Sequence, residues 1–126
     1  MTHDHTLSLI ELMLPEGILN DFIIIGYHQG DSGKHVYNKI LTIDLEEKKI
    51  IPEAYKNHVY KACGFMEPRI IEDYPIRNML VSLRVRRRRW EVVIEGKKLK
   101  VSRDFNSIAQ GTRMSAEYAA FLKEID

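Results

Sequence analysis

A short arginine-rich stretch contains the residues of this sequence best suited to bind a ligand. It reads Arg84-Val-Arg-Arg-Arg-Arg-Trp, so five of six consecutive positions are arginine. Guanidinium groups bind phosphate well because their planar set of donors matches two oxygens at once. Consecutive arginines cannot all share one face of a strand, and an unpaired charge in the interior costs several kcal/mol. The stretch must therefore lie at an exposed bend or contact an anion.

Basic residues are concentrated around this stretch. Residues 76–114 contain eleven Lys and Arg and three acidic residues, a balance of 11 − 3 = +8, although the whole chain carries +1. The first 63 residues hold six basic and nine acidic residues, a net −3. Such a polarised chain is typical of nucleic-acid binding. The predicted phosphate-contacting residues are Arg84, Arg86, Arg87, Arg88, Arg89, Lys98, Lys100 and Arg103.

A purely structural role of the arginines is the alternative to phosphate binding. The arginines could form a solvated strand end and pair with the acids elsewhere in the chain. The two interpretations differ in DNA binding. Replacing Arg86, Arg88 and Arg89 with alanine should leave folding nearly unchanged, because an exposed ion pair contributes only about 0–1 kcal/mol. The same change should weaken binding to duplex DNA strongly, and unchanged binding would indicate a solvated strand end.

Residues typical of catalytic or metal sites are sparse. The five histidines show no HExxH spacing, and no Gly-rich phosphate loop is present. Cys63 is the single cysteine, which excludes an internal disulfide and a cysteine-rich zinc site. A metal shared by His3 and His5, or a nucleophile pair of His58 and Cys63, has little support. The acidic pairs Glu46-Glu47 and Glu72-Asp73 are typical of turns and solvated faces. We therefore expect no enzymatic activity, no cofactor and no metal.

The strand that carries the arginines changes its phase. Apolar residues occupy odd positions from Met79 to Val85, with polar residues between them, which is typical of a strand with one buried face. From Trp90 to Ile94 the apolar positions are even. A shift of one residue predicts a bulge or sharp bend within Arg86–Arg89.

A hairpin follows this bend. A two-residue turn at Glu95-Gly96 pairs Trp90 with Val101 and Val92 with Leu99, which agrees with the apolar pattern. Trp90 is therefore expected in the apolar face of the hairpin. A role as a stacking platform for an unpaired base is the alternative.

The remaining segments predict an α+β fold. Residues 22–27 and 35–45 form a first hairpin, residues 46–64 look irregular, and a short strand lies at Ile70-Ile71. A helix opens at Ser8, stops at Pro15, and should be buried or packed on a partner. Ser115 caps a final helix with an apolar stripe. We expect one domain over residues 1–126, with 1–5 as a disordered tail and two β-hairpins forming a small antiparallel sheet flanked by short N- and C-terminal helices.

Six short segments follow one another along the chain: Leu14-Pro-Glu-Gly, Ile51-Pro-Glu-Ala-Tyr, Pro75-Ile-Arg, Arg86-Arg-Arg-Arg-Trp, Ser102-Arg-Asp-Phe-Asn and Gly111-Thr-Arg-Met. Taken together in this order, they resemble the N-terminal region protein of a class of bacterial insertion-sequence transposases. In that class a short first reading frame is separate from the frame for the catalytic DDE domain. The resemblance covers nearly the whole chain.

The resemblance implies a non-catalytic DNA-binding region that contacts transposon ends. The chain is more distantly similar to the zinc-binding N-terminal domain of a broader transposase superfamily, but it lacks the paired cysteines of that domain. The implied partners are double-stranded DNA and the separately encoded catalytic domain, and a homodimer is left open. The alternative function is an interaction or regulatory module, for instance a transposase inhibitor, with no DNA contact. A reducing cytoplasm is expected, since Cys63 is the single cysteine and the sequence shows neither a signal peptide nor an apolar segment of about 20 residues.

Overall fold

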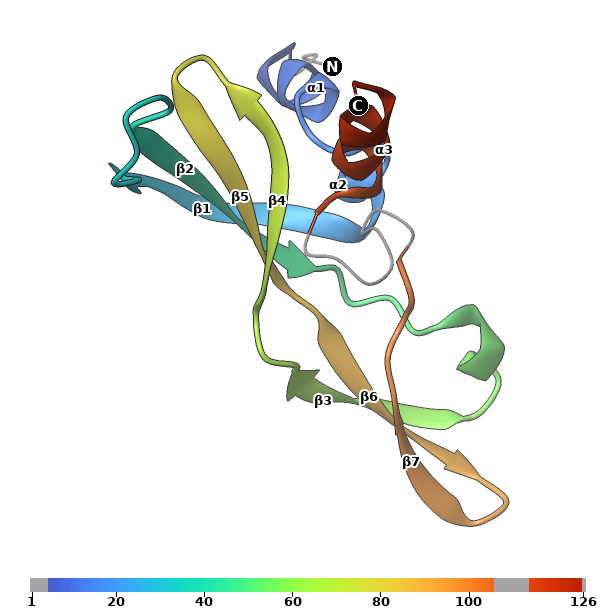
Figure 1. Ribbon diagram of the computed structural model, residues 1–126. Coiled ribbons are helices and arrows are strands. Elements are labelled where there is room, and N and C mark those ends of the chain that lie inside the picture. The colour runs from blue at the N-terminus through green and yellow to red at the C-terminus, as the bar shows by residue number, and fades with distance from the viewer. Residues whose placement is uncertain (1–4, 106–113, 126) are drawn as a thin grey trace.

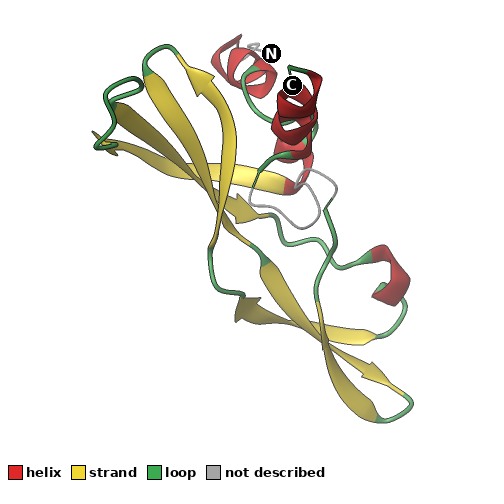
Figure 2. Ribbon diagram, in the orientation of Figure 1, coloured by secondary structure: helices red, strands yellow, loops and turns green. Residues whose placement is uncertain are grey.

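The computed structural model describes residues 5–105 and 114–125, and strands dominate it (Figure 2). Its elements in chain order are α1 (His5–Leu12), α2 (Ile18–Asp21), β1 (Phe22–Asp31), β2 (Lys39–Glu47), the 3₁₀ helix η1 (Glu53–Tyr55), β3 (Val59–Phe65), β4 (Arg69–Ile76), β5 (Met79–Arg86), β6 (Arg88–Ile94), β7 (Lys97–Val101) and α3 (Ala116–Glu124).

The strands form two sheets, which we call sheet A and sheet B. Sheet A has the order β1-β2-β5-β4, and sheet B has the order β3-β6-β7. The expected α+β class and the terminal helices are confirmed. The expected single antiparallel sheet is refined, because the hairpins divide between two sheets and β2 pairs with β5 in parallel. Both predicted hairpins, β1–β2 and β6–β7, are present and antiparallel.

A long bent hairpin joins the two sheets. Its first arm is β3 followed by β4, and its second arm is β5 followed by β6 (Figure 1). Arg87 alone separates β5 from β6, which confirms the predicted bend. The register also shifts between Ala62 and Phe65 and between Asp73 and Ile76 on the first arm. Such shifts bend a strand. The shift at the end of β3 lies where the chain leaves sheet B for sheet A, and the shift at the end of β4 lies beside the turn into β5.

The main core lies on one face of sheet A, at the end where the three helices gather (Figure 1). The predicted odd positions of β5 point into it. Leu83 is fully buried there, beside Leu45 of β2. The buried residues of this core are Leu14, Ile18, Phe22, Leu45, Ile71, Val81, Leu83 and Val85.

The N-terminal helix differs from expectation. α1 begins at His5, before Ser8, so residue 5 is helical, and residues 1–4 of the expected tail lie outside the described residues. None of the α1 residues is buried, and the exposed fraction of Leu12 is 84%. The expectation of a buried helix is therefore wrong within this chain, and α1 presents apolar residues to the surface.

The C-terminal helix is tied to sheet A through its cap. Ser115 caps α3 as predicted, accepting a hydrogen bond from the Tyr118 backbone N–H at 3.2 Å. The same hydroxyl donates to Oδ1 of Asp73 at 2.7 Å, and the Ser115 N–H donates to the carbonyl of Glu72 at 2.8 Å. The aromatic ring of Tyr74 packs on those of Tyr118 and Phe121. The loop expected after Phe105, with most of the Gly111-Thr-Arg-Met segment, lies outside the described residues.

Asp73 makes the docking of α3 sensitive to pH. Glu72-Asp73 was expected on a solvated face, but Asp73 is only 5% exposed. Burial raises the pKa of Asp73, and the hydrogen bond from Ser115 opposes that rise. A carboxyl group with a raised pKa binds its proton more tightly in the folded state. The folded state is therefore favoured at low pH, and this contribution is lost as pH rises from the ordinary value near 3.8 through the raised value.

We expect the variant Asp73→Asn to lose less stability than the wild type as pH rises through this window, because the amide cannot ionise and still offers an oxygen to Ser115. Urea unfolding at a series of pH values measures this difference. Glu124→Gln, at an exposed carboxylate near the end of α3, is the control and should follow the wild-type profile. Parallel profiles for wild type and Asp73→Asn would show that the ionisation of Asp73 does not control the docking.

Candidate nucleic-acid interface

Two of the predicted arginines pack on one aromatic ring where the two sheets meet. The guanidinium carbons of Arg86 and Arg88 lie 4.2 and 4.7 Å from the ring centroid of Phe65. Phe65 is the last residue of β3 and is the register partner of Arg88. Contacts of this kind contribute about 0.5–1 kcal/mol at exposed sites and more when desolvated. They join the end of β3 to the junction of β5 and β6.

Arg88 also binds the end of β2. Its backbone N–H donates to Oε1 of Glu47 and its Nε donates to the Glu47 carbonyl, both at 2.9 Å. Glu47 was expected on a solvated face, but it is fully buried. Burial raises the pKa of Glu47, while the Arg88 N–H and the guanidinium groups of Arg103, Arg87 and Arg88 oppose that rise. The pair joins sheet A to the start of sheet B.

Arg87 and Arg103 form a second internal contact. The Arg87 guanidinium donates to the Arg103 carbonyl, and the Arg103 guanidinium pairs with Asp21 at the end of α2. Both guanidinium groups lie over the ring of Phe105. Arg87 Nε, Arg103 Nη1 and Glu47 Oε2 are buried without a hydrogen-bond partner. These groups face the interior of the protein and are poorly placed to meet a phosphate.

The outer face of sheet A carries two cross-strand ion pairs. Because β2 and β5 pair in parallel, Asp44 lies beside Arg84 and Glu46 lies beside Arg86. The nitrogen–oxygen distances are 3.8 and 3.1 Å. An open groove of about 570 Å³ adjoins these pairs, and Phe65 and the two arginines are among its lining residues. A phosphate entering this groove would compete with carboxylates already in place.

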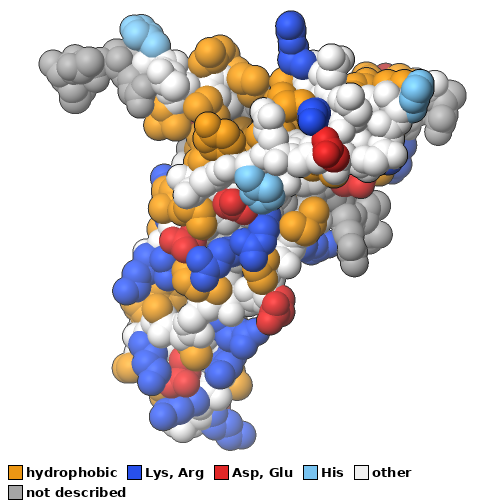
Figure 3. All heavy atoms as spheres, turned by 90° about the vertical axis from the view of Figure 1, so that its left-hand side faces the viewer, with side chains coloured by type: hydrophobic (Ala, Val, Ile, Leu, Met, Phe, Trp, Pro, Cys, Tyr) orange, Lys and Arg blue, Asp and Glu red, His pale blue; other side chains and the backbone are white. Residues whose placement is uncertain are grey.

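One face of sheet B carries more positive than negative charge. We call it the basic face, and its charged residues are Lys61, Arg89, Glu91, Lys98 and Lys100. Lys61 and Lys100 are the register partners of Glu91 on either side, and Lys98 is the partner of Val93. Arg89 alternates with the buried Trp90, so it points to the same face. Glu91 is the single carboxylate among the described residues of this face, and it lies 3.6 Å from the ammonium group of Lys61. Lys and Arg side chains crowd the lower part of the molecule in Figure 3, the end formed by sheet B.

The eight predicted residues therefore divide into three groups. Arg89, Lys98 and Lys100 lie together on the basic face, with no side-chain hydrogen bond or ion pair to any described residue. Arg84 and Arg86 are half-exposed and paired with carboxylates. Arg87, Arg88 and Arg103 are bound to carbonyl or carboxylate oxygens inside the structure. The expectation that Arg86 and Arg88 are simply exposed is wrong, because both are part-buried and both contact Phe65.

Two further residues complete the description of the basic face. Lys61 is absent from the predicted set because residues 46–64 look irregular in the sequence, so the strand β3 was not predicted there. Trp90 lies beneath the basic face, only 3% exposed and in edge-to-face contact with Tyr60 at 5.8 Å. Its burial confirms the predicted apolar position and excludes the stacking-platform alternative.

Comparison of the sequence with models of protein families and with characterised proteins finds no match, and comparison of the fold with solved structures finds none. The described residues contain no group of three or more His, Cys, Asp or Glu side chains placed to hold a metal ion. Nor does any helix within residues 5–105 and 114–125 have the length and apolar character needed to cross a membrane. The function is therefore inferred from the charge and geometry of the basic face and from the sequence resemblance.

Proposed function

We propose that this chain is the non-catalytic, DNA-binding region of a bacterial insertion-sequence transposase and acts in the cytoplasm on transposon-end DNA. The basic face is the observation that supports DNA binding. It presents Lys61, Arg89, Lys98 and Lys100 around one carboxylate, on a three-stranded surface. The link to transposition rests on the sequence resemblance, and the separately encoded catalytic domain is the proposed second partner.

The contacts on this face are to phosphate. Extended lysine side chains carry point charges and no planar donor array, so they position a protein on the DNA backbone without reading bases. Each phosphate contact contributes about −0.9 to the slope of log affinity against log salt concentration. Contact through the four cations of the basic face predicts a slope of about −3.6, whereas contact through all eight residues predicted from sequence gives about −7. The slope therefore gives the number of phosphate contacts, and substitutions show which cations make them.

We expect Lys98→Ala with Lys100→Ala to weaken duplex binding and to make the slope shallower by about 1.8, because two phosphate contacts are lost. The affinity should fall similarly for transposon-end and random duplexes. Fluorescence anisotropy with labelled duplexes across a salt series measures both quantities. Lys34→Ala with Lys123→Ala removes the same charge away from sheet B and is the matched control. An unchanged slope in the Lys98/Lys100 variant would contradict contact through the basic face.

A second candidate function is a protein-interaction or regulatory module. The exposed apolar residues of the terminal helices favour it, since Leu12 of α1 and Ile125 after α3 are 84% and 63% exposed. Absence of wild-type binding to any duplex at low salt, in protein that is folded, would replace DNA binding with this candidate.

A further inference from the structure

The described strands leave four sheet edges, and three of them are protected against pairing with another chain. β7 carries Lys97, Lys98 and Lys100 over only five residues. β3 is interrupted by a register shift at Gly64 and carries Lys61. β4 contains Pro75, and Glu72 on it is bridged to Met114. Short length, lysine, proline, bulges and a covering segment are the devices that block edge-to-edge association.

The fourth edge, β1, lacks most of these devices. It is ten residues long, and from Phe22 to Tyr27 it carries neither a charge nor a proline. Ile23, Ile25 and Tyr27 are 45%, 47% and 73% exposed. A register shift at Ile25 adds twist, but it places no charge or proline in the path of a partner strand. A long, apolar, uncharged edge of this kind is a site for pairing with another strand.

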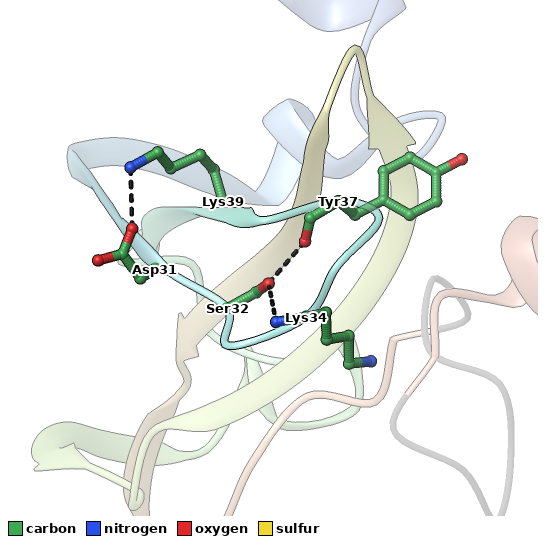
Figure 4. Close-up of polar contacts among 5 residues, drawn as sticks. All are labelled: Asp31, Ser32, Lys34, Tyr37 and Lys39. Atoms are coloured by element: carbon green, nitrogen blue, oxygen red, sulfur yellow. Dashed lines mark hydrogen bonds and ion pairs between the residues drawn. The ribbon is translucent and has the colours of Figure 1, made fainter.

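The one carboxylate of β1 itself, Asp31, lies beyond this segment at the end of the strand (Figure 4). The carboxylates of Asp44 and Glu46 on the neighbouring β2 are paired with Arg84 and Arg86 of β5. Lys39 pairs with Asp31 at 2.8 Å and lowers the pKa of that carboxyl group. The Ser32 hydroxyl donates to the Tyr37 carbonyl at 2.6 Å and accepts from the Lys34 N–H at 3.0 Å. The strand thus ends in a closed loop whose ion pair is satisfied within the same chain, and His28, Gln29 and Gly30 separate this loop from the uncharged segment 22–27.

We propose that a second copy of this chain pairs with β1 in antiparallel, joining the two A sheets edge to edge across a two-fold axis. Antiparallel pairing about a two-fold axis brings the same segment to itself, so the segment must be self-complementary. Residues 22–27 meet this condition because they contain no charge that would face its own copy. Pairs between β-branched and aromatic side chains, each contributing about 0.2–1 kcal/mol, then form between Ile23, Ile24, Ile25 and Tyr27 of the two copies. The interface leaves the basic faces free, because their residues lie on sheet B and β1 belongs to sheet A.

Sedimentation velocity of the full chain across a wide concentration range tests this assignment. The wild type is expected to sediment as a dimer of 14.7 kDa chains. Ile23→Lys and Ile25→Lys, made separately and together, should shift it to the monomer, because lysines at an edge block pairing. Leu12→Lys adds the same charge to an exposed apolar residue of α1 and is the matched control, expected to remain dimeric.

Hydrogen exchange supplies a readout that needs no variant. Amides of residues 23–28 should become more protected as the wild-type concentration rises, while those of α1 should not change. A wild type that is monomeric at every concentration would overturn the proposal. So would a dimer that persists in folded Ile23→Lys/Ile25→Lys but is lost in Leu12→Lys, since that places the interface on the helices. DNA binding is not involved in these measurements, so they are independent of the proposed function.

Discussion

Replacing Arg88 with alanine is expected to lower the free energy of unfolding by about 2–3 kcal/mol, whereas Lys98→Ala should change it by less than about 1 kcal/mol. The two residues lie on the same hairpin and differ in what they contact. Arg88 donates to the Glu47 carbonyl at 2.9 Å, stacks on Phe65, and brings positive charge near a carboxylate that is fully buried. Removing Arg88 takes away a positive charge close to the Glu47 carboxylate. A buried charge without such partners is costly.

Urea unfolding followed by circular dichroism measures both variants, and an unchanged denaturant slope would show that the compared states are the same. Arg88→Lys is an informative third variant. It keeps the charge but loses Nε as a donor and the planar stack on Phe65, so it should lie between Arg88→Ala and wild type. Equal stability of Arg88→Ala and Lys98→Ala would mean that the contacts at Glu47 contribute nothing measurable.

The same contrast determines which variants can test DNA binding. Replacing Arg86, Arg88 and Arg89 together alters the contacts to Phe65 and Glu47 as well as the surface charge. A loss of binding in that variant would not separate a missing phosphate contact from a damaged junction between the sheets. Lys98 and Lys100 are exposed and have no partner among the described residues, so their removal changes the charge alone.

The local structure of the arginine-rich strand could be predicted because the signal is local. Alternation places Val81, Leu83 and Val85 on one face, and the register about Gly96 places Trp90 opposite Val101. The change from odd to even positions predicts the bend at Arg87. Each of these inferences needs only the period of a strand and the length of a turn.

The partners of the arginines could not be predicted because they come from distant segments. Arg84 and Arg86 pair with Asp44 and Glu46 across a parallel contact between β2 and β5, about forty residues away in the sequence. Nothing in the alternation of either strand indicates which other strand lies beside it. The adjacent glutamates 46 and 47 look solvated for the same reason, since one is on the outer face and the other is buried beneath the junction.

β3 was missed for a different reason. Its seven residues include Lys61 and Gly64, and the register shift at Gly64 breaks the period of two. Without β3, Lys61 could not be placed beside Glu91, and the basic residues were expected on a two-stranded hairpin instead of a three-stranded sheet. The bulge interrupts the alternation of apolar and polar residues by which a strand is recognised in a sequence. The partner strand, β6, keeps this alternation and remains easy to recognise.

Trp90→Ala is expected to cost about 3–5 kcal/mol, which is a large part of the stability of a domain of this size. Trp90 and Val92 are the buried residues of sheet B and lie outside the main core, whereas α1, α2 and α3 all gather at sheet A (Figure 1). Sheet B therefore relies on one large side chain. Leu99→Ala, on the same face but 46% exposed, should cost much less and is the matched control.

Trp90→Phe separates the packing of the ring from its polar atom. The indole Nε1 is buried without a hydrogen-bond partner, so the tryptophan carries a desolvation cost that phenylalanine lacks. We expect Trp90→Phe to retain most of the stability lost in Trp90→Ala, with a change below about 1.5 kcal/mol.

Native-state hydrogen exchange in Trp90→Ala should also show faster opening of β6 and β7 than of β2 and β5, because the two sheets have separate cores. Equal acceleration in both sheets would show that the junction at Arg87, Arg88 and Glu47 couples them into one cooperative unit.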